Sequence, residues 1–256
     1  MTIWPKIILY LYVFIVGLCI GSFVNVLIYR IPRGRNIAKG RSFCPACGHT
    51  LAARDLLPLF SFLFLKGRCR YCGARISPRY PLVELAGGLL AVVSPLALGW
   101  TLSALLAFLA GGVLLAVALI DADTQEIPDS LVLALAALSA LSAVFTRDAA
   151  LLSRVIGLFC VSLPMLLANL VRPTSFGGGD IKLCAAAGFL LGWQSMLAAA
   201  FIALLGGGGY GAWLLASRRK GRREHFAFGP FLAAGVYIAL LAGGRLIGWY
   251  LGLFGI

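Results

Sequence analysis

Long runs of apolar residues without a charge dominate the chain, and each predicts one or two membrane helices. The first run covers residues 7–29. A helix of about 20 apolar residues is long enough to cross the hydrocarbon core, so this run predicts one span. No small-residue cleavage site ends the run, and we therefore expect a transmembrane helix rather than a signal peptide. The other runs are residues 85–120, 130–146, 155–171, 183–217 and 226–244.

Two of these runs are long enough for two spans each. Residues 85–120 would turn near Gly99, and residues 183–217 would turn near Gly192. In lipid, a single chain segment satisfies its own backbone hydrogen bonds when it forms a helix. The pattern therefore predicts an all-α polytopic membrane protein with about eight transmembrane helices.

The composition agrees with a bilayer as the solvent of most of the chain. Hydrophobic residues make up 61% of the 256 residues, charged residues make up 12%, and the mean hydropathy is +0.96. A soluble domain usually has about a quarter of its residues charged. The chain has too little polar surface to cover a water-soluble globule of this size.

The net charge of +13 is distributed unevenly and predicts the sidedness of the loops. Residues 30–79 hold half of the 22 Lys and Arg residues and a single acid, Asp55. Basic loops remain on the cytoplasmic side of a membrane, so we expect residues 30–81 there. Alternation then places three further loops on the same side, at residues 121–129, 172–182 and 218–224. The opposite side keeps four basic residues, namely Lys6, Arg147, Arg154 and Arg245.

A basic stretch of this kind could bind nucleic acid or anionic lipid. Few aromatic residues alternate with its basic residues, so it lacks a platform on which bases could stack. We therefore expect contact with anionic lipid headgroups and no binding of nucleic acid.

Four cysteines within the basic stretch have the spacing of a zinc ribbon. Two residues separate the cysteines of each pair, and 21 residues separate the pairs. Two tight turns of this kind aim four thiolates at one tetrahedral site, which is closed and therefore structural. Disulfides and free thiols are the alternatives, and a cytoplasmic location argues against disulfides. The expected ligands of a structural zinc ion are Cys44, Cys47, Cys69 and Cys72.

Two acids lie at boundaries of predicted spans on the same side of the membrane. Asp121 follows the run that ends at residue 120, and Asp180 follows three glycines just before the run 183–217. Acids at such boundaries are costly unless they are paired, hydrated or functional. Two neighbouring carboxylates can share one proton and act as general base and general acid. Solvation is the simpler interpretation for the three loop acids, Asp123, Glu126 and Asp129.

These motifs resemble those of the type IV prepilin peptidases. Residues 119–123 with residues 127–129 resemble the first aspartate motif of that family, and residues 177–182 resemble its second, the G-x-G-D motif. In the second motif Gly178 would be the variable position. Further matches follow in the order of the family, at residues 21–32, the four cysteines, residues 79–84 and residues 228–230.

The resemblance implies an intramembrane aspartic protease with Asp121 and Asp180 as its catalytic pair. Such enzymes remove the short basic leader of prepilins and pseudopilins at the cytoplasmic face of the bacterial inner membrane. Many also methylate the new N-terminal residue with S-adenosylmethionine, an activity associated with the N-terminal half and its cysteine loop. The cofactor is implied by the resemblance alone. Supporting positions would be Asp123, Asp129, Lys182, Gly177, Gly179 and Glu84.

We therefore expect three parts along the chain. Residues 1–29 would form the first transmembrane helix, residues 30–81 a cytoplasmic zinc-ribbon-like insert, and residues 82–256 the transmembrane aspartic peptidase domain. Two other classes of protein remain as alternatives. A membrane transporter would place its acids near mid-bilayer, often in repeated halves. A zinc-ribbon membrane adaptor without catalysis would leave the glycines before Asp180 without a purpose.

Overall fold

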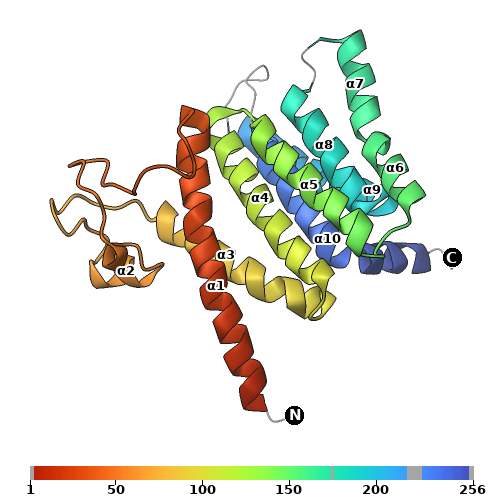
Figure 1. Cartoon of the computed structure of the whole chain (residues 1–256). Helices are drawn as coiled ribbons and strands as arrows, with labels where there is room; N and C mark the ends of the chain where they lie inside the picture. The colour runs from red at the N-terminus through yellow and green to blue at the C-terminus, as the bar shows by residue number, and fades with distance from the viewer. Residues whose placement is uncertain (1–2, 174–175, 218–226, 254–256) are drawn as a thin grey trace. The chain divides into compact units, whose positions relative to one another are not determined.

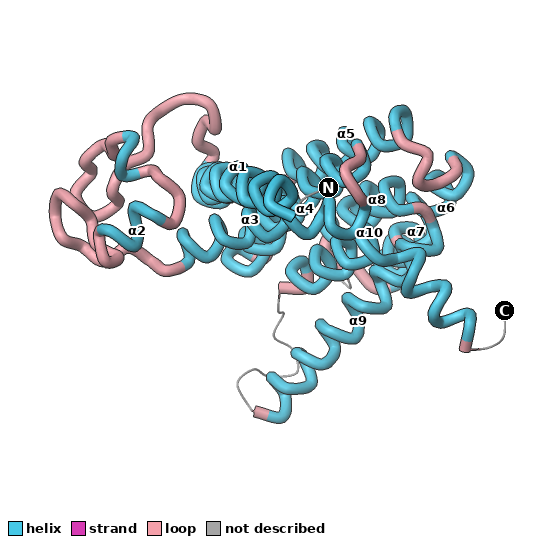
Figure 2. Tube along the Cα trace, turned by 90° about the horizontal axis from the view of Figure 1, so that it is seen from below, coloured by secondary structure: helices cyan, strands magenta, loops and turns pink. Residues whose placement is uncertain are grey.

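A computed structural model describes residues 3–173, 176–217 and 227–253, and the chain divides into two compact units (Figure 1). The first unit is Met1–Leu96 and the second is Ala97–Ile256. Throughout the described ranges the regular structure is helical, apart from two isolated β-bridges (Figure 2). The predicted all-α fold is confirmed.

Two long helices and a loop-rich segment form the first unit. The long helices are α1 (Ile3–Arg30) and α3 (Arg79–Leu98). They pack through glycine, since a Cβ at Gly17 would lie 2.6 Å from the carbonyl oxygen of Gly87. Small residues allow membrane helices to approach at backbone distance. Between the long helices come η1 (Ile31–Arg33), η2 (Ala53–Asp55) and α2 (Phe60–Phe64), and Figure 2 shows the loops of this unit gathered around α2.

Seven helices make up the described part of the second unit. They are α4 (Leu102–Thr124), α5 (Asp129–Phe145), α6 (Leu151–Cys160), α7 (Ser162–Val171), α8 (Gly178–Leu191), α9 (Trp193–Ala216) and α10 (Gly229–Gly252). In this unit α4 packs against α5 and α10, and α8 packs against α5 and α6 (Figure 1).

Small and hydroxyl residues hold α8 against its neighbours. Gly188 of α8 and Gly157 of α6 meet backbone to backbone, so neither position has room for a side chain. On the other face, the Ser139 hydroxyl of α5 donates to the carbonyl of Ala186 at 2.9 Å. Contacts of both kinds are those that drive helix association in lipid, where apolar surface alone gives no preference.

All of the apolar runs predicted from the sequence are helical in the described residues. Six helices are long and apolar enough to cross a membrane, with α6 and α7 counted as one. The chain turns at Gly99 and Gly192, which have φ of +73° and +79°, where turns were predicted. The predicted loop at residues 218–224 lies outside the described residues.

Two of the predicted spans are shorter than a bilayer is thick. Helix α5 has 17 residues and α8 has 14. At 1.5 Å per residue α8 is about 21 Å long, whereas the hydrocarbon core is about 30 Å thick. The run at residues 183–217 was predicted to hold two spans, but its turn at Gly192 leaves only the part before residue 192 to α8, which is too short for a full span.

The surface of the long helices is apolar, as expected for a protein in contact with lipid. Leu133, Val144, Leu152 and Leu170 each expose about 70% of their surface, and many other large apolar side chains are exposed. A soluble protein rarely exposes contiguous apolar area of this extent. With its six candidate spans, the chain is a multi-pass membrane protein.

One basic residue lies where the sequence pattern did not place it. Arg154 was predicted to flank a span on the outer side. It instead lies in the first turn of α6 and is 1% exposed. Its guanidinium donates to the carbonyls of Phe189 and Leu190, in the last turn of α8, at 3.2 and 2.9 Å. The buried arginine thus satisfies carbonyls that have no partner within α8.

Candidate functional site

The last turn of α4 carries Asp121 to the beginning of α10. The residue is 6% exposed, and its Oδ2 accepts the backbone N–H of Gly229 at 2.7 Å. Gly229 is the first residue of α10, so this N–H has no acceptor within its own helix. A Cβ on Gly229 would lie only 2.6 Å from that carboxylate oxygen. Glycine is therefore required for the carboxylate to reach the helix terminus.

Asp180 occupies the first turn of α8, where its side chain folds back on the residue that begins the helix. The carboxylate accepts the backbone N–H of Gly177, the N-cap residue of α8. This is one half of a capping box. A Cβ on Gly177 would lie 2.9 Å from Oδ2 of Asp180, which explains glycine at this position.

The two carboxylates lie close enough for the charge of Asp121 to act on Asp180. Oδ1 of Asp180 is buried and has no hydrogen-bond partner among the described residues. Each carboxylate also meets the N-terminus of a helix, where the helix dipole favours an anion. Burial next to a like charge opposes ionisation of both groups together. Two acids placed in this way can hold one proton between them.

The loop between α4 and α5 packs onto the first turn of α8. A Cβ on Gly179 would lie 2.7 Å from the Cβ of Ile127, so the third glycine is also required. Lys182 donates to Asp129 at 2.7 Å, across the same junction. Both side chains of this ion pair are more than half exposed, so its contribution to stability is small. A Cβ on Gly178 would meet nothing within 4 Å, which agrees with its predicted place as the variable position of the G-x-G-D motif.

Two acids that were predicted to support the catalytic pair, Asp123 and Glu84, lie in different units of the chain. Asp123 is exposed, in the last turn of α4. Glu84 belongs to the first unit, where its Oε2 accepts the backbone N–H of Leu59 at 2.8 Å. Leu59 has φ of +61°, a conformation that is costly for a residue with a branched side chain.

The four predicted cysteines form a second site, in the first unit. Their sulfur atoms all lie within 4.8 Å of one another. The two pairs are held by the same hydrogen bonds: the N–H of Cys44 donates to the carbonyl of His49 and the N–H of Cys69 to that of Ala74. A glycine with positive φ follows each pair, at +70° and +71°. The segment therefore has two equivalent knuckles, which supports the predicted ribbon.

The chemistry of this cluster fits a metal ion. In a tetrahedron with metal–sulfur bonds of about 2.3 Å, the sulfurs are about 3.8 Å apart. Sγ of Cys44 and Sγ of Cys72 are 3.9 Å apart. Backbone N–H groups of Cys47 and Ala46 help to lower the pKa of Cys44 to about 7, against the opposing effect of burial. Against a hydrogen bond from the Ala74 backbone, desolvation and the neighbouring thiols raise the pKa of Cys72 to about 11. Cys44 is therefore held ready to bind a cation as a thiolate.

Comparison with known proteins agrees with these two sites. Residues 15–98 match the model of the bacterial peptidase A24 N-terminal domain, and residues 108–212 match that of the type IV leader peptidase family. A prepilin leader peptidase/N-methyltransferase of Aeromonas salmonicida is 37% identical, over 93% of this chain and 92% of its own length. The chain belongs to the type IV leader peptidase family. A Bacillus subtilis protein of the same name is 36% identical, over 93% of this chain and 96% of its own length.

Membership in this family argues against the transporter and the adaptor. No solved structure matches the chain, so the geometry of the site comes from the present structure alone. Both predicted catalytic acids fall within the region that matches the leader peptidase family, and the four cysteines fall within the matched N-terminal domain.

Two residues that position the site, Gly229 and Arg154, were not assigned a role from the sequence. Gly229 belongs to a motif that the sequence analysis matched to the family, but its contact with Asp121 joins residues 108 positions apart. Arg154 holds the end of α8 opposite to Asp180. Neither role has a local signal in the sequence, since each depends on how distant helices pack.

Proposed function

We propose that the chain is an aspartic endopeptidase that removes the basic leader of prepilins or pseudopilins, with Asp121 and Asp180 as its catalytic pair. The observation that carries the proposal is the buried oxygen of Asp180, which has no hydrogen-bond partner among the residues that the structure describes and lies near a second carboxylate. A group of this kind is costly in a folded protein unless it has a function.

The two acids divide the chemistry of hydrolysis between them. The ionised carboxylate takes a proton from water, whose oxygen attacks the carbonyl carbon of the scissile bond. The protonated acid donates its proton to the carbonyl oxygen. When the carbon–nitrogen bond breaks, a proton passes to the leaving amine, and the pair returns to its original state. Neither a covalent intermediate nor a metal takes part in these steps.

The positions of charged residues indicate where the reaction takes place. Basic residues cluster at 30–79, which favours a cytoplasmic location for that segment in the inner membrane of a bacterium. Alternation of the spans places the end of α4 and the start of α8 on the same side. The hydrophobic helix of a prepilin would then lie in the membrane, with its leader in the cytoplasm next to the two carboxylates.

We also propose that Cys44, Cys47, Cys69 and Cys72 hold a structural zinc ion. A closed site of four thiolates leaves no position for substrate, so the ion would stabilise the loops of the insert and not catalyse hydrolysis. The relatives named above are also called N-methyltransferases, and we extend that activity to this chain. S-adenosylmethionine would supply the methyl group to the new N-terminal residue.

Cleavage of a leader-bearing prepilin by the purified chain in lipid vesicles tests the peptidase proposal. We expect that Asp121→Asn and Asp180→Asn each abolish cleavage, while both variants insert and keep the thermal stability of the native chain. Asp148→Asn is the matched control, because Asp148 is an exposed acid outside the site and contacts Ser103. Cleavage by Asp180→Asn at the native rate would exclude the proposed pair.

A further inference from the structure

A patch of apolar side chains is exposed in the segment where the charge pattern predicted a cytoplasmic insert. The exposed fractions are 54% for Leu57, 52% for Phe60, 66% for Leu63 and 81% for Phe64. All four residues lie in α2 or in the three residues before it. An exposed apolar patch that is rimmed by polar residues usually marks an interface with protein or with a membrane. A partner other than water is therefore expected on this surface.

The patch is the outer face of α2, and the inner face of the same helix is turned to the interior of the first unit. Ser61, Phe62 and Leu65 line a cavity between α1, α3 and the four-cysteine segment. The ring of Phe62 also closes over Gly67, where a Cβ would lie 3.1 Å from it. These inner side chains therefore serve the packing of the insert, whereas the outer side chains contribute little to it.

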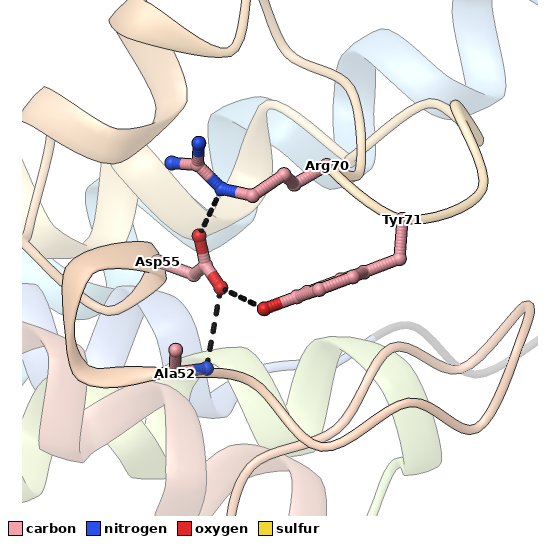
Figure 3. Close-up of polar contacts among 4 residues, drawn as sticks. All are labelled: Ala52, Asp55, Arg70 and Tyr71. Carbon is pink, nitrogen blue, oxygen red and sulfur yellow. Dashed lines mark hydrogen bonds and ion pairs between the residues drawn. The ribbon is translucent and has the colours of Figure 1, made fainter.

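A buried carboxylate holds the start of the patch in place. The Asp55 side chain is 3% exposed and accepts from Nε of Arg70 at 2.7 Å and from the Tyr71 hydroxyl at 2.9 Å (Figure 3). It also accepts the N–H of Ala52 at 3.2 Å. Arg70 and Tyr71 lie between the two cysteines of the second pair, so these bonds attach the patch to that knuckle. The apolar surface thus belongs to an ordered part of the insert.

A hydrogen bond to α3 relates the patch to the depth of the membrane. The N–H of Leu59, the N-cap residue of α2, donates to Oε2 of Glu84 at 2.8 Å, so α2 lies beside the start of α3 (Figure 1). Helix α3 is a candidate span that begins at Arg79, five residues before Glu84. At 1.5 Å per residue this separation is about 7–8 Å along the helix. Interfacial helices bury their apolar face by about 5–10 Å. For a span that starts at the membrane surface, the bond gives the start of α2 this depth.

Basic side chains border the patch on both sides. Arg54 precedes it, Lys66 and Arg68 follow it, and all three are exposed. Arg70 differs, because its charge is paired with that of Asp55. Anionic headgroups attract basic side chains at the surface of a membrane, whereas the basic leader of a prepilin would be repelled by them. The charge of the border therefore favours lipid as the partner.

We propose that residues 56–64 insert into the membrane interface, with the four exposed apolar side chains among the upper parts of the acyl chains and the three basic side chains at anionic headgroups. The insert is then held to the membrane by this patch as well as by α1 and α3. This contact goes beyond the headgroup contact that the basic charges predicted, because apolar side chains enter the lipid. The proposed peptidase chemistry does not require it, so either proposal can fail without the other.

Photolabelling of the full chain in vesicles of phosphatidylglycerol and phosphatidylethanolamine tests the proposal without a variant. One probe is a phospholipid with a diazirine near the headgroup end of its acyl chain, and a second probe carries the diazirine at the far end of the chain. Trypsin releases the patch in the peptide 55–66 and the first cysteine pair in the peptide 42–54. We expect the shallow probe to label 55–66 and not 42–54, and the deep probe to label neither.

A charged residue in the patch should remove the segment from the lipid. Phe64→Glu should lower the label in 55–66 by about tenfold or more, because a carboxylate is expelled from the acyl chains. Phe64 is 81% exposed, so this variant should keep the native resistance of the insert to protease in detergent. Ile37→Glu is the matched control, because Ile37 is 41% exposed in the same unit but lies outside the patch. Its label in 55–66 should equal that of the native chain.

The outcomes separate lipid from other partners of the patch. Absence of the shallow label from 55–66 in the native chain would show that protein covers the patch, and equal labelling by the deep probe would show that the segment enters the bilayer core. Either result, or an unchanged label in Phe64→Glu, would overturn the proposal. In vesicles of phosphatidylcholine alone the shallow label should fall, because the basic side chains lose their anionic partners. A label that does not depend on anionic lipid would overturn the role of these side chains.

Discussion

Replacement of Arg154 by alanine tests how the short helix α8 is stabilised. The buried guanidinium makes five hydrogen bonds: two to carbonyls in the last turn of α8, one to the carbonyl of Ala149, and two to the hydroxyls of Ser142 and Thr146. Hydrogen bonds between membrane helices contribute about 0.6 kcal/mol each on average, which gives about 3 kcal/mol for the five. Arg154→Ala should therefore lower the free energy of unfolding by about 3 kcal/mol.

This loss is large enough to measure in detergent. A change of about 3 kcal/mol lowers the midpoint of thermal unfolding by about 6–12 °C for a chain of this size. Thermal unfolding can be followed through the reactivity of the buried thiol of Cys184, which lies on α8 and becomes accessible when the helix separates from its neighbours. Arg154→Lys should fall between the native chain and the alanine variant, because an ammonium cannot reach all five acceptors.

The control for this prediction is Arg147→Ala, which removes an exposed arginine from the adjacent loop. We expect its unfolding midpoint to be close to that of the native chain, as is usual for surface substitutions. If Arg154→Ala were no less stable than Arg147→Ala, the carbonyls of Phe189 and Leu190 would not depend on the guanidinium, and the proposed role of Arg154 in ending α8 would be wrong.

Three further predictions follow from the two sites. Gly229→Ala should lower the rate of leader cleavage by about 100-fold, because a Cβ at this position displaces Asp121. The control is Gly244→Ala on the same helix, where a Cβ meets nothing, and this variant should cleave at the native rate. Elemental analysis should find one zinc ion per chain. Removal of the ion by a chelator should make the four-cysteine segment sensitive to protease. A segment that resists protease equally well with and without the metal would contradict this prediction. The hydrogen bond from Arg70 is the main cause of a lowered pKa of Asp55. A carboxylate with a depressed pKa stabilises the folded state above its unfolded pKa and loses that effect as the pH falls through its folded pKa. The stability difference between the native chain and Asp55→Asn should therefore be constant from pH 7 to about 5 and shrink in stronger acid, and a difference independent of pH down to about 2 would contradict the assignment.

The sequence predicted the features of this chain that depend on local composition. Apolar runs predict membrane helices because each segment partitions into lipid largely on its own hydrophobicity. The spacing of cysteines within each pair predicts a metal-binding knuckle because the turn itself positions the two sulfurs. Asp121 and Asp180 were predicted to converge because alternation of the spans brings their ends to one side of the membrane.

Other features depend on packing between distant segments and could not be predicted in this way. A pattern of polar and apolar residues treats Arg154 as the edge of a span, because an arginine in lipid is costly. Its burial is possible only where another helix ends and presents carbonyl groups. Likewise, nothing near Gly229 in the sequence indicates that a carboxylate more than a hundred residues away will occupy the space where a side chain would be.

The length of α8 connects these observations. A helix of about 21 Å cannot bring both of its ends to the two faces of a hydrocarbon core of about 30 Å, so at least one end must be satisfied by protein groups. At its C-terminus the donors come from Arg154. At its N-terminus the carboxylate of Asp180 accepts the N–H of Gly177, and the charge of Asp121 on α4 acts on it. In a long helix both ends would be solvated by water and headgroups. The short helix instead holds the buried Oδ1 of Asp180 at its N-terminus, where we propose that two carboxylates share a proton and act on a peptide bond.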